Sequence, residues 1–541
     1  MKHPDPYSNQ AHSEPQSSNG LGRSETMPRK SLIKRGTKSA IRQITLLGLL
    51  GCASPLVLAA SFDLADGVSL EWDTTARYSA AWRVEGQNKT LLANPNGDDG
   101  NRNFKKGLIQ NRFDLISEAD LNFGDFGAFV RGRAYYDDQY HQSNDHNSPD
   151  TANSTSVAHN RFTKDSKELS GDKAELLDAF VYGSFDISDR VLSLRAGRQV
   201  MNWGESLFIQ GGISSAMSPL DATKANLPGV ELKEIFLPVG QIFGQIDLTE
   251  NISVSGYYQY EWDKTRLDAA GSYFSTDDFI DDGGESLILA PGLSAARGKD
   301  KDASDSGQYG IAVHYLAEEL NATEFGFYYI NYHDKLPQVI GGDFINPAPG
   351  VFLPTSYYLE YAEDIKLYGL SISTVVGDTN VGAEISYRKD QPVMVGELVA
   401  PERVDAVQAQ ASVIHIFGDN PLMDNLTLTA EVGYNRVSDP KGELVNDQDA
   451  WGYTVSFESE FNGVAPGVDL TVPVNLSQGV DGKSSLPGTF TEGASSLGVS
   501  TQFTYLNNFQ TEIGYTAFFG DVEDNALTDR DFVSLNVKYS F

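Results

Sequence analysis

Charged side chains of both signs stand at alternate positions in several segments of the N-terminal half. The charged positions are Glu71, Asp73, Arg77, Glu118, Asp120, Arg131, Arg133, Asp178 and Arg195. Alternate residues of a β-strand share one face, so these groups are predicted to crowd together on one side of a sheet. Carboxylate and guanidinium groups arranged in this way can orient a polar or amphipathic solute by its charged end. They can equally form salt bridges with one another, and the two roles are compatible.

The motifs of common enzymes are missing from the sequence. It contains no GxSxG, no HExxH and no Gly-rich phosphate-binding loop. The histidines are scattered, and His415, between Val413 and Phe417, is the nearest candidate for a lipid hydrolase. A lone histidine among apolar neighbours is more typical of a membrane interface. We therefore expect a protein that is not an enzyme and that uses no cofactor.

Two groups of aspartates stand in the segment 267–305. They are Asp277, Asp278, Asp281 and Asp282, and then Asp300, Asp302 and Asp305. Carboxylates could bind calcium weakly, but neither group has the spacing of an EF-hand. We interpret both groups as solvated loop charge and predict no metal site. The Asp, Asn, Ser and Gly content of residues 138–173 and 267–305 predicts that these loops are mobile and solvated.

Alternation of apolar and polar residues predicts β-strands along most of the chain. The alternation is clearest from Val68 to Val84, with tryptophans near both ends, and from Val533 to the terminal Phe541. A period of two is typical of a strand with one apolar face. The predicted strands cover residues 68–84, 108–123, 127–137, 176–187, 191–200, 235–248, 252–262, 308–317, 323–332, 365–374, 381–389, 404–417, 426–437, 451–461, 466–476, 494–505, 509–519 and 530–541.

The segments between these strands alternate in length. Gaps after even-numbered strands are short, as at 124–126 and 188–190, whereas gaps after odd-numbered strands are mostly long, as at 85–107 and 138–175. A barrel with both termini in the periplasm needs short periplasmic turns and long extracellular loops, whereas a soluble sandwich has no reason to keep such a phase. The sequence therefore predicts an all-β fold, a transmembrane antiparallel β-barrel of about 18 strands, with about 16 as the alternative count.

The N-terminal region has the composition of an export signal. A stretch rich in Lys and Arg precedes the apolar stretch 44–58, which ends in small residues. We expect residues 1–26 to be a non-native upstream extension, with Met27 as the true start. Residues 27–60 are then a secretory signal peptide, and residues 61–541 form a single barrel domain in the cell outer membrane.

The remaining composition excludes several classes of protein. Cys52 is the only cysteine and lies in the leader, so the mature chain is expected to have neither disulfides nor thiolate chemistry. A formal net charge of −33 argues against nucleic acid as a partner. After the leader, no apolar run reaches the roughly 18 residues of a membrane-spanning helix.

Motifs spread over the chain carry a family resemblance. The matching stretches are 103–107, 129–132, 177–182, 198–200, 203–206, 228–229, 231, 233–234, 302–308 and 331–333, of which Trp-Gly-Glu-Ser at 203–206 is the most specific. They resemble a family of proteobacterial outer-membrane barrels that is catalogued as a domain of unknown function. The resemblance implies an exported barrel, often encoded near a periplasmic partner protein and an exporter of the resistance-nodulation-division (RND) type, with movement of hydrophobic compounds suspected. It supplies no catalytic residues, and the cysteine pair that some members have in the loop 267–305 is missing here.

The segment 201–234 is unusually apolar for an outer loop. Besides Trp203 and Glu205, it contains Leu207, Phe208, Ile209, Ile213 and Met217. Barrels of this size are otherwise wide enough for an aqueous channel. We predict that the segment folds into the barrel and narrows it, with an external cap as the alternative. Trp203 and Glu205 therefore join the charged positions above as candidates for pore lining or constriction.

Together these features predict an outer-membrane channel for hydrophobic or amphipathic small molecules. A general or substrate-specific porin for small polar solutes is the first alternative, and a surface adhesin or structural barrel without transport is the second. The expected partners are outer-membrane lipid, the small-molecule solute and, by resemblance, a periplasmic partner protein and an RND-type exporter. The sequence leaves open the identity of the solute, the direction of transport and the oligomeric state.

Overall fold

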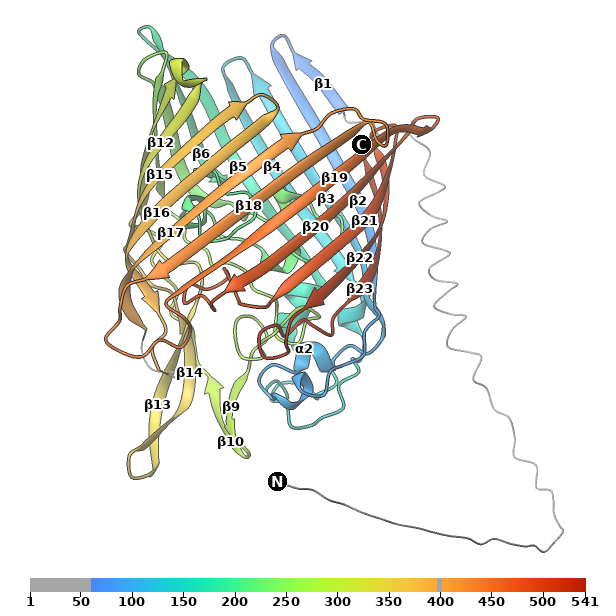
Figure 1. Ribbon diagram of the computed structural model, residues 1–541, viewed down its shortest axis with the longest axis vertical. Helices are drawn as coiled ribbons and strands as arrows, with labels where there is room; N and C mark the ends of the chain where they lie inside the picture. Colours follow the sequence, from blue (N-terminus) through green and yellow to red (C-terminus); the bar gives the residue numbers. More distant parts are fainter. Residues whose placement is uncertain (1–59, 397–400) are drawn as a thin grey trace, which may run out of the picture. The chain divides into compact units, whose positions relative to one another are not determined.

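The chain forms a closed ring of eighteen antiparallel strands (Figure 1). The computed structural model describes residues 60–396 and 401–541, so the predicted upstream extension and the predicted signal peptide up to residue 59 lie outside the described residues. The ring strands are β2 (Val68–Arg83), β3 (Gly107–Phe123), β4 (Phe126–Asp137), β5 (Asp172–Ile187), β6 (Arg190–Gln199), β7 (Val239–Asp247), β8 (Ile252–Gln259), β11 (Gln308–Ala317), β12 (Thr323–Tyr332), β15 (Ile365–Val376), β16 (Thr379–Val393), β17 (Glu402–Ile416), β18 (Asn425–Val437), β19 (Asp449–Ala465), β20 (Val468–Asp481), β21 (Ser495–Tyr505), β22 (Phe509–Phe519) and β23 (Phe532–Ser540).

The first and last ring strands pair with each other and close the barrel. The β2–β23 ladder runs from Arg83 opposite Phe532 to Thr75 opposite Ser540. Thr74 and Phe541 then exchange two backbone hydrogen bonds of 2.7 and 2.9 Å. A ring without free edges is what allows strands to cross a bilayer, because every backbone group finds a partner. The predicted all-β barrel of eighteen strands is confirmed.

The outer surface of the ring is apolar. Large side chains that face away from the lumen remain exposed, among them Trp72, Val181, Ile242, Leu370 and Ile513. Exposed apolar residues on alternate positions of every strand form the lipid-facing band of an outer-membrane barrel. The protein is therefore located in the outer membrane, as predicted.

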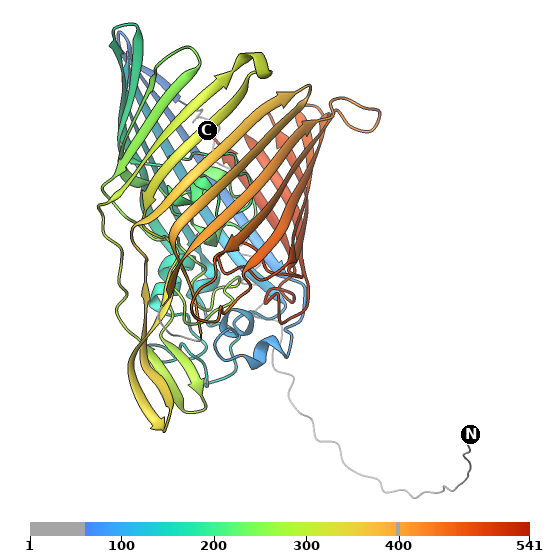
Figure 2. The ribbon, with the colours of Figure 1, turned by 60° about the vertical axis from the view of Figure 1, so that its left-hand side comes forward.

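The two ends of the barrel differ in the length of their connections (Figures 1 and 2). At the end where β1 (Ala60–Ala65) pairs antiparallel with the start of β2, the turns are short: Gly124 and Asp125 join β3 to β4, and Ser188 and Asp189 join β5 to β6. Gly124 has a φ of +68°, which a two-residue turn requires and which glycine adopts without strain. Long loops gather at the opposite end, in the predicted phase.

The predicted strand boundaries lie within five residues of the observed ones, and the difference at the start of β7 has a clear cause. This strand starts at Val239 rather than at 235, because the preceding residues belong to a loop. Phe236 forms an isolated bridge with Leu220, and the N–H of Leu237 donates to the carbonyl of Pro219 at 2.9 Å. An apolar run that continues into a buried loop thus extends the apparent strand.

The long loops contain structure that the sequence did not predict. A small sheet of β9 (Ser286–Ala290), β10 (Leu293–Arg297), β13 (Gln338–Ala348) and β14 (Val351–Glu360) projects from the loop end of the barrel (Figure 1). The short helices of the described residues are η1 (Leu91–Ala93), α2 (Asp99–Arg102), η2 (Asp138–His141), α3 (Lys164–Ser166), η3 (Lys167–Gly171), η4 (Ile213–Ala216), η5 (Ala222–Lys224), η6 (Leu232–Glu234) and η7 (Glu318–Leu320). None of the helices within residues 60–396 and 401–541 is long and apolar enough to span a membrane.

The prediction that loops 138–173 and 267–305 are solvated is wrong for part of each loop. Tyr140, Phe162 and Tyr273 are buried together against Phe104 in an aromatic cluster. The aspartates follow the same pattern, since Asp278 and Asp281 are buried rather than solvated. Polar composition failed as a signal because a few widely spaced aromatic residues were enough to fold these loops against one another.

Candidate functional site

A loop between β6 and β7, residues 200–238, crosses the interior of the barrel (Figure 1). Its residues contact inward-facing side chains from both halves of the ring, including Arg77 on β2, Gln259 on β8 and Glu431 on β18. We call residues 200–238 the crossing loop. The predicted inward fold of this segment is what the structure shows, and the external cap is not observed.

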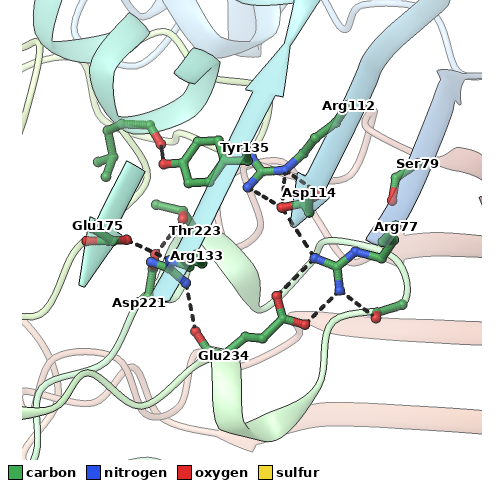
Figure 3. A network of polar contacts seen from close by, with 12 residues as sticks. Arg77, Ser79, Arg112, Asp114, Arg133, Tyr135, Glu175, Asp221, Thr223 and Glu234 are labelled. Atoms are coloured by element: carbon green, nitrogen blue, oxygen red, sulfur yellow. Dashed lines mark hydrogen bonds and ion pairs between the residues drawn. The ribbon is translucent and has the colours of Figure 1, made fainter. Parts of the chain in front are cut away.

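Arg77 attaches the crossing loop to the wall built by β2 and β3 (Figure 3). Its guanidinium donates to both oxygens of Glu234 at 2.7 and 2.9 Å and to the carbonyl of Gly229 at 2.8 Å. Asp114 approaches the same guanidinium at 3.4 Å and pairs with Arg112 at 2.8 Å. All four charged side chains are buried, so bidentate geometry matters here more than at a surface.

Arg133 on β4 makes the second attachment on this wall (Figure 3). It pairs with Glu175 on β5 at 2.6 Å and with Asp221 of the crossing loop, and it donates to the carbonyl of Glu234 at 3.1 Å. Arg266, from the loop after β8, also pairs with Glu175, at 2.8 Å. Two strands and two loops therefore meet in one ion-pair network.

Burial and neighbouring charges shift the pKa values of two crossing-loop residues in this network, Lys224 and Asp221. Lys224 is fully buried over the ring of Tyr135, with its Nζ 4.3 Å from the ring centroid. Burial, and then Arg112 and Arg133, lower the pKa of Lys224 well below its usual range. Burial alone would raise the pKa of Asp221, but Lys224 and Arg133 hold it below its usual value. Asp221 is thus held as a carboxylate among cations.

The opposite wall holds the tip of the crossing loop through its backbone. Glu384 on β16 accepts from the N–H groups of Glu205 and Ile213 at 2.6 and 2.8 Å. Glu431 on β18 accepts from the N–H groups of residues 207, 208 and 209 at 3.2, 2.6 and 2.7 Å. Arg388 on β16 donates to the carbonyls of residues 211 and 212. A loop without secondary-structure partners thus satisfies its backbone groups with charged side chains.

Apolar side chains of the crossing loop form a core inside the barrel. Trp203, Ile213 and Met217 are buried against inward-facing residues of β7, β8, β11, β12 and β15, including Tyr257 and Leu367. The Trp203 ring lies 5.1 Å from that of Tyr257. This side of the lumen is therefore filled.

The residues predicted from sequence to line a pore fall into two groups. Arg77, Arg131, Arg133, Asp178 and Trp203 are buried, and Arg131 pairs with Asp178 and lies 3.9 Å from Glu118. The others are partly or fully exposed nearer the periplasmic end: Glu71, Asp73, Glu118, Asp120, Arg195 and, at the crossing loop, Glu205. Arg77 and Arg133 thus contact the crossing loop directly, and Glu118 contacts it through Lys233 at 3.0 Å.

Several residues of the site were missed by sequence analysis. They are Glu384, Arg388 and Glu431 on the far wall, and Asp221, Lys224 and Glu234 on the crossing loop. For the strand residues a signal existed, since Glu384 and Glu431 are single acidic residues on the polar face of alternating segments. The loop residues follow no period, so nothing in their spacing predicted which side chains would face an arginine.

The contacts of His415, the nearest candidate for a lipid hydrolase, are those of a residue with a structural role. Its ring accepts from or donates to the hydroxyl of Thr379 at 2.7 Å and packs edge-on against Phe417, with ring centroids 4.3 Å apart. Both neighbours lie at the periplasmic turn end of β16 and β17. These contacts agree with the interpretation of His415 as a membrane-interface residue.

Two cavities lie between the crossing loop and the remaining wall. The first has a volume of about 290 Å³ and lies between the loop tip at Phe208 and the outer ends of β19–β22. The second, of about 250 Å³, is lined by Arg77, Glu231, Gln502, Glu512 and Lys538, among others. Both cavities border β21, the first at Ser496 and the second at Gln502. These two positions are six residues apart along the strand, which corresponds to about 20 Å.

The family described as "Protein of unknown function (DUF1302)" matches residues 40–541. The chain belongs to this family. The resemblance noted from the sequence motifs, to a family catalogued as a domain of unknown function, is thereby confirmed. No curated protein matches this DUF1302 chain.

Solved structures similar to this DUF1302 protein include outer-membrane barrels. OccAB4 of Acinetobacter baumannii is 11% identical, with 87% of this chain and 98% of that chain covered and a TM-score of 0.44. OccK2 (OpdF) of Pseudomonas aeruginosa, in complex with glucuronate, is 12% identical, with 87% and 98% covered and a TM-score of 0.39. The outer-membrane channel DcaP of A. baumannii is 11% identical, with 89% and 100% covered and a TM-score of 0.37.

Proposed function

We propose that this DUF1302 protein is an outer-membrane channel for small amphipathic or hydrophobic molecules. The observation that carries the proposal is the lining of the first cavity. The chain has a formal net charge of −33, yet none of the side chains that line this cavity is charged. A charged solute would lose its hydration in this cavity without gaining an oppositely charged partner. A neutral solute has no charge that needs such a partner.

The lining also has two chemically different sides. Phe208, Phe490 and Phe518 offer aromatic surface, and Thr454 and Ser477 offer hydroxyl groups. Uncharged polar residues outnumber apolar ones in this lining, so hydroxyl and amide groups can bind the polar end of an amphipathic solute while the phenylalanines contact its apolar end. The crossing loop closes the other side of the lumen, so a solute is directed past this lining.

Uptake into proteoliposomes tests this function. The wild-type protein is expected to admit an uncharged aromatic alcohol faster than its carboxylate analogue or a sugar of similar size. Phe208→Asp puts a charge at the exposed loop tip and is expected to slow uptake of the alcohol. Leu232→Asp is the matched control, because Leu232 is exposed on the same loop but lines neither cavity. Equal effects of the two variants would contradict the proposal.

A porin for small polar solutes is the second candidate function. The second cavity favours it, since Arg77, Lys538 and Glu512 offer charges of both signs. If the sugar enters proteoliposomes faster than the aromatic alcohol, the polar porin is the better description.

The family resemblance adds a proposed assembly. It implies a periplasmic partner protein and an RND-type exporter, which would meet the barrel at its end with short turns. Affinity purification of the tagged barrel from crosslinked cells, followed by mass spectrometry, tests this association. Recovery of neither protein would count against it.

A further inference from the structure

Three outer loops meet around a group of buried carboxylates at the loop end of the barrel. Asp98 and Asp99 lie at the start of α2, between β2 and β3, and Asp278 lies between β8 and β11. Their exposed fractions are 3%, 4% and 0%. A carboxylate oxygen of Asp98 and one of Asp99 lie within 4.8 Å of each other. Like charges this close in a buried environment repel one another strongly, so the group needs compensation.

Asp99 is compensated by the loop between β4 and β5. Its carboxylate accepts from the hydroxyl of Thr151, from Nδ2 of Asn153 at 2.9 Å and from Nε2 of His146 at 2.9 Å. Nδ1 of His146 accepts from the N–H of Ser148 at 3.2 Å. The proton of the neutral imidazole therefore sits on Nε2, which makes His146 a hydrogen-bond donor to Asp99 rather than a metal ligand.

Asp98 and Asp278 are each compensated at only one oxygen. Oδ2 of Asp98 accepts from Arg102, and Oδ2 of Asp278 accepts from the N–H of Asp99 at 3.1 Å. The Oδ1 atoms of both side chains are buried and have no hydrogen-bond partner among the described residues. A buried carboxylate oxygen without a partner is costly.

We propose that the carboxylates of Asp98 and Asp99, together with the adjoining Asp278, bind a divalent cation of the calcium class, which joins the three outer loops. Carboxylate oxygens are hard ligands, and calcium accepts six to eight oxygens in flexible geometry, so backbone carbonyls and water can complete its shell. Thr151, Asn153 and His146 then act as positioning residues, because their hydrogen bonds fix the orientation of the Asp99 carboxylate. The site is independent of what passes through the barrel.

Calcium titration of the purified barrel in detergent, after removal of metals with EDTA, tests the site. Calorimetry is expected to show saturable binding of one ion per chain, and calcium is expected to protect the outer loops from protease. Even the loss of an outer-shell partner weakens metal binding about 10- to 100-fold, so Asp278→Asn is expected to weaken it at least about tenfold. Asp98→Asn provides a second variant at the other free oxygen.

Asp277→Asn is the matched control, because Asp277 is the adjacent aspartate but is exposed. This variant is expected to bind calcium like the wild type. Gel migration with and without boiling shows that each variant is folded. The proposal is overturned if the wild type shows no saturable binding, or if Asp277→Asn weakens binding as much as Asp278→Asn. Preferred binding of zinc that is lost in His146→Ala would also overturn it, since oxygen ligands alone would then not define the site.

Discussion

Two single carboxylates hold the backbone of the crossing loop against the far wall. Glu384 and Glu431 together accept five backbone N–H groups from the loop tip. These are charge-assisted bonds inside a lumen, where the backbone has few other partners. The position of the loop tip therefore depends on two side chains that lie far from it in the sequence.

We expect Glu431→Ala to release the loop tip. The variant loses three charged hydrogen bonds, each worth roughly 1.5–3 kcal/mol, so single-channel recordings should show a larger and noisier conductance. Glu458→Ala is the control, because Glu458 lies on the inner face of β19 but is exposed. Identical traces from the two variants would show that Glu431 does not fix the loop.

Lys335 predicts a dependence of stability on pH. This buried lysine donates to the carbonyl of Ala216 in the crossing loop at 3.0 Å. Burial, only partly offset by Asp334, lowers the pKa of Lys335 from 10.5 to about 8. Between these values the unfolded chain binds more protons than the folded one, so stability rises with pH across this window.

Thermal unfolding of the wild type and of Lys335→Met, followed from pH 7 to pH 11, checks this effect. The stability of the wild type relative to the variant should rise by at most about 1.4 kcal/mol per pH unit within the window. It should be constant below pH 8. Parallel curves for the two proteins would contradict the assignment to Lys335.

At the scale of single residues, sequence analysis found one side of the ion-pair network and missed the other. Arg77 and Arg133 stand on strands, whose period of two assigns them to the inner face. Their partners Asp221 and Glu234 stand in the crossing loop, where no period assigns a direction. The position of the crossing loop inside the barrel could be predicted from its apolar residues, but its ion pairs could not.

At the scale of elements, the crossing loop is predicted to control conductance. Deleting residues 211–222 removes Ile213 and Met217 from the internal core and Asp221 from its pairing with Arg133. The ring is closed by its own ladders, so the barrel should still form while the conductance rises toward that of a wide aqueous pore. Single-channel recording measures the result, and an unchanged conductance would show that the loop does not constrict the lumen.

The ring strands were predictable because each crosses the membrane with one lipid-facing and one lumen-facing side. The strands of the small outer sheet were not, since β9 and β10 are only five residues long and pair within loops. Their apolar side chains are not sorted by a bilayer. Phe352 at the outer hairpin is exposed, for example, whereas Tyr357 five residues later is fully buried.

At the scale of the whole molecule, closure of the ring is predicted to depend on the last residues. Truncation after Lys538 removes the pairing of Ser540 with Thr75 and both backbone bonds between Phe541 and Thr74. The free edge that remains should lower the yield of folded barrel. The fraction that migrates differently on gels before and after boiling measures this yield. A control in which Phe541 is replaced by Tyr keeps the backbone bonds and should fold like the wild type.

The crossing loop is attached to two walls of the barrel, β2–β5 and β16–β18, and leaves the wall of β19–β22 uncovered. The open space in the lumen therefore lies to one side of the barrel axis. Residues such as Ser477 and Ser496 on the uncovered wall take no part in the attachments. Mutations there can alter which cargo is admitted while the scaffold stays intact. Related barrels could therefore acquire different solute specificities through substitutions on this one part of the wall. The same residues are where a protein engineer would begin to build a sensing nanopore.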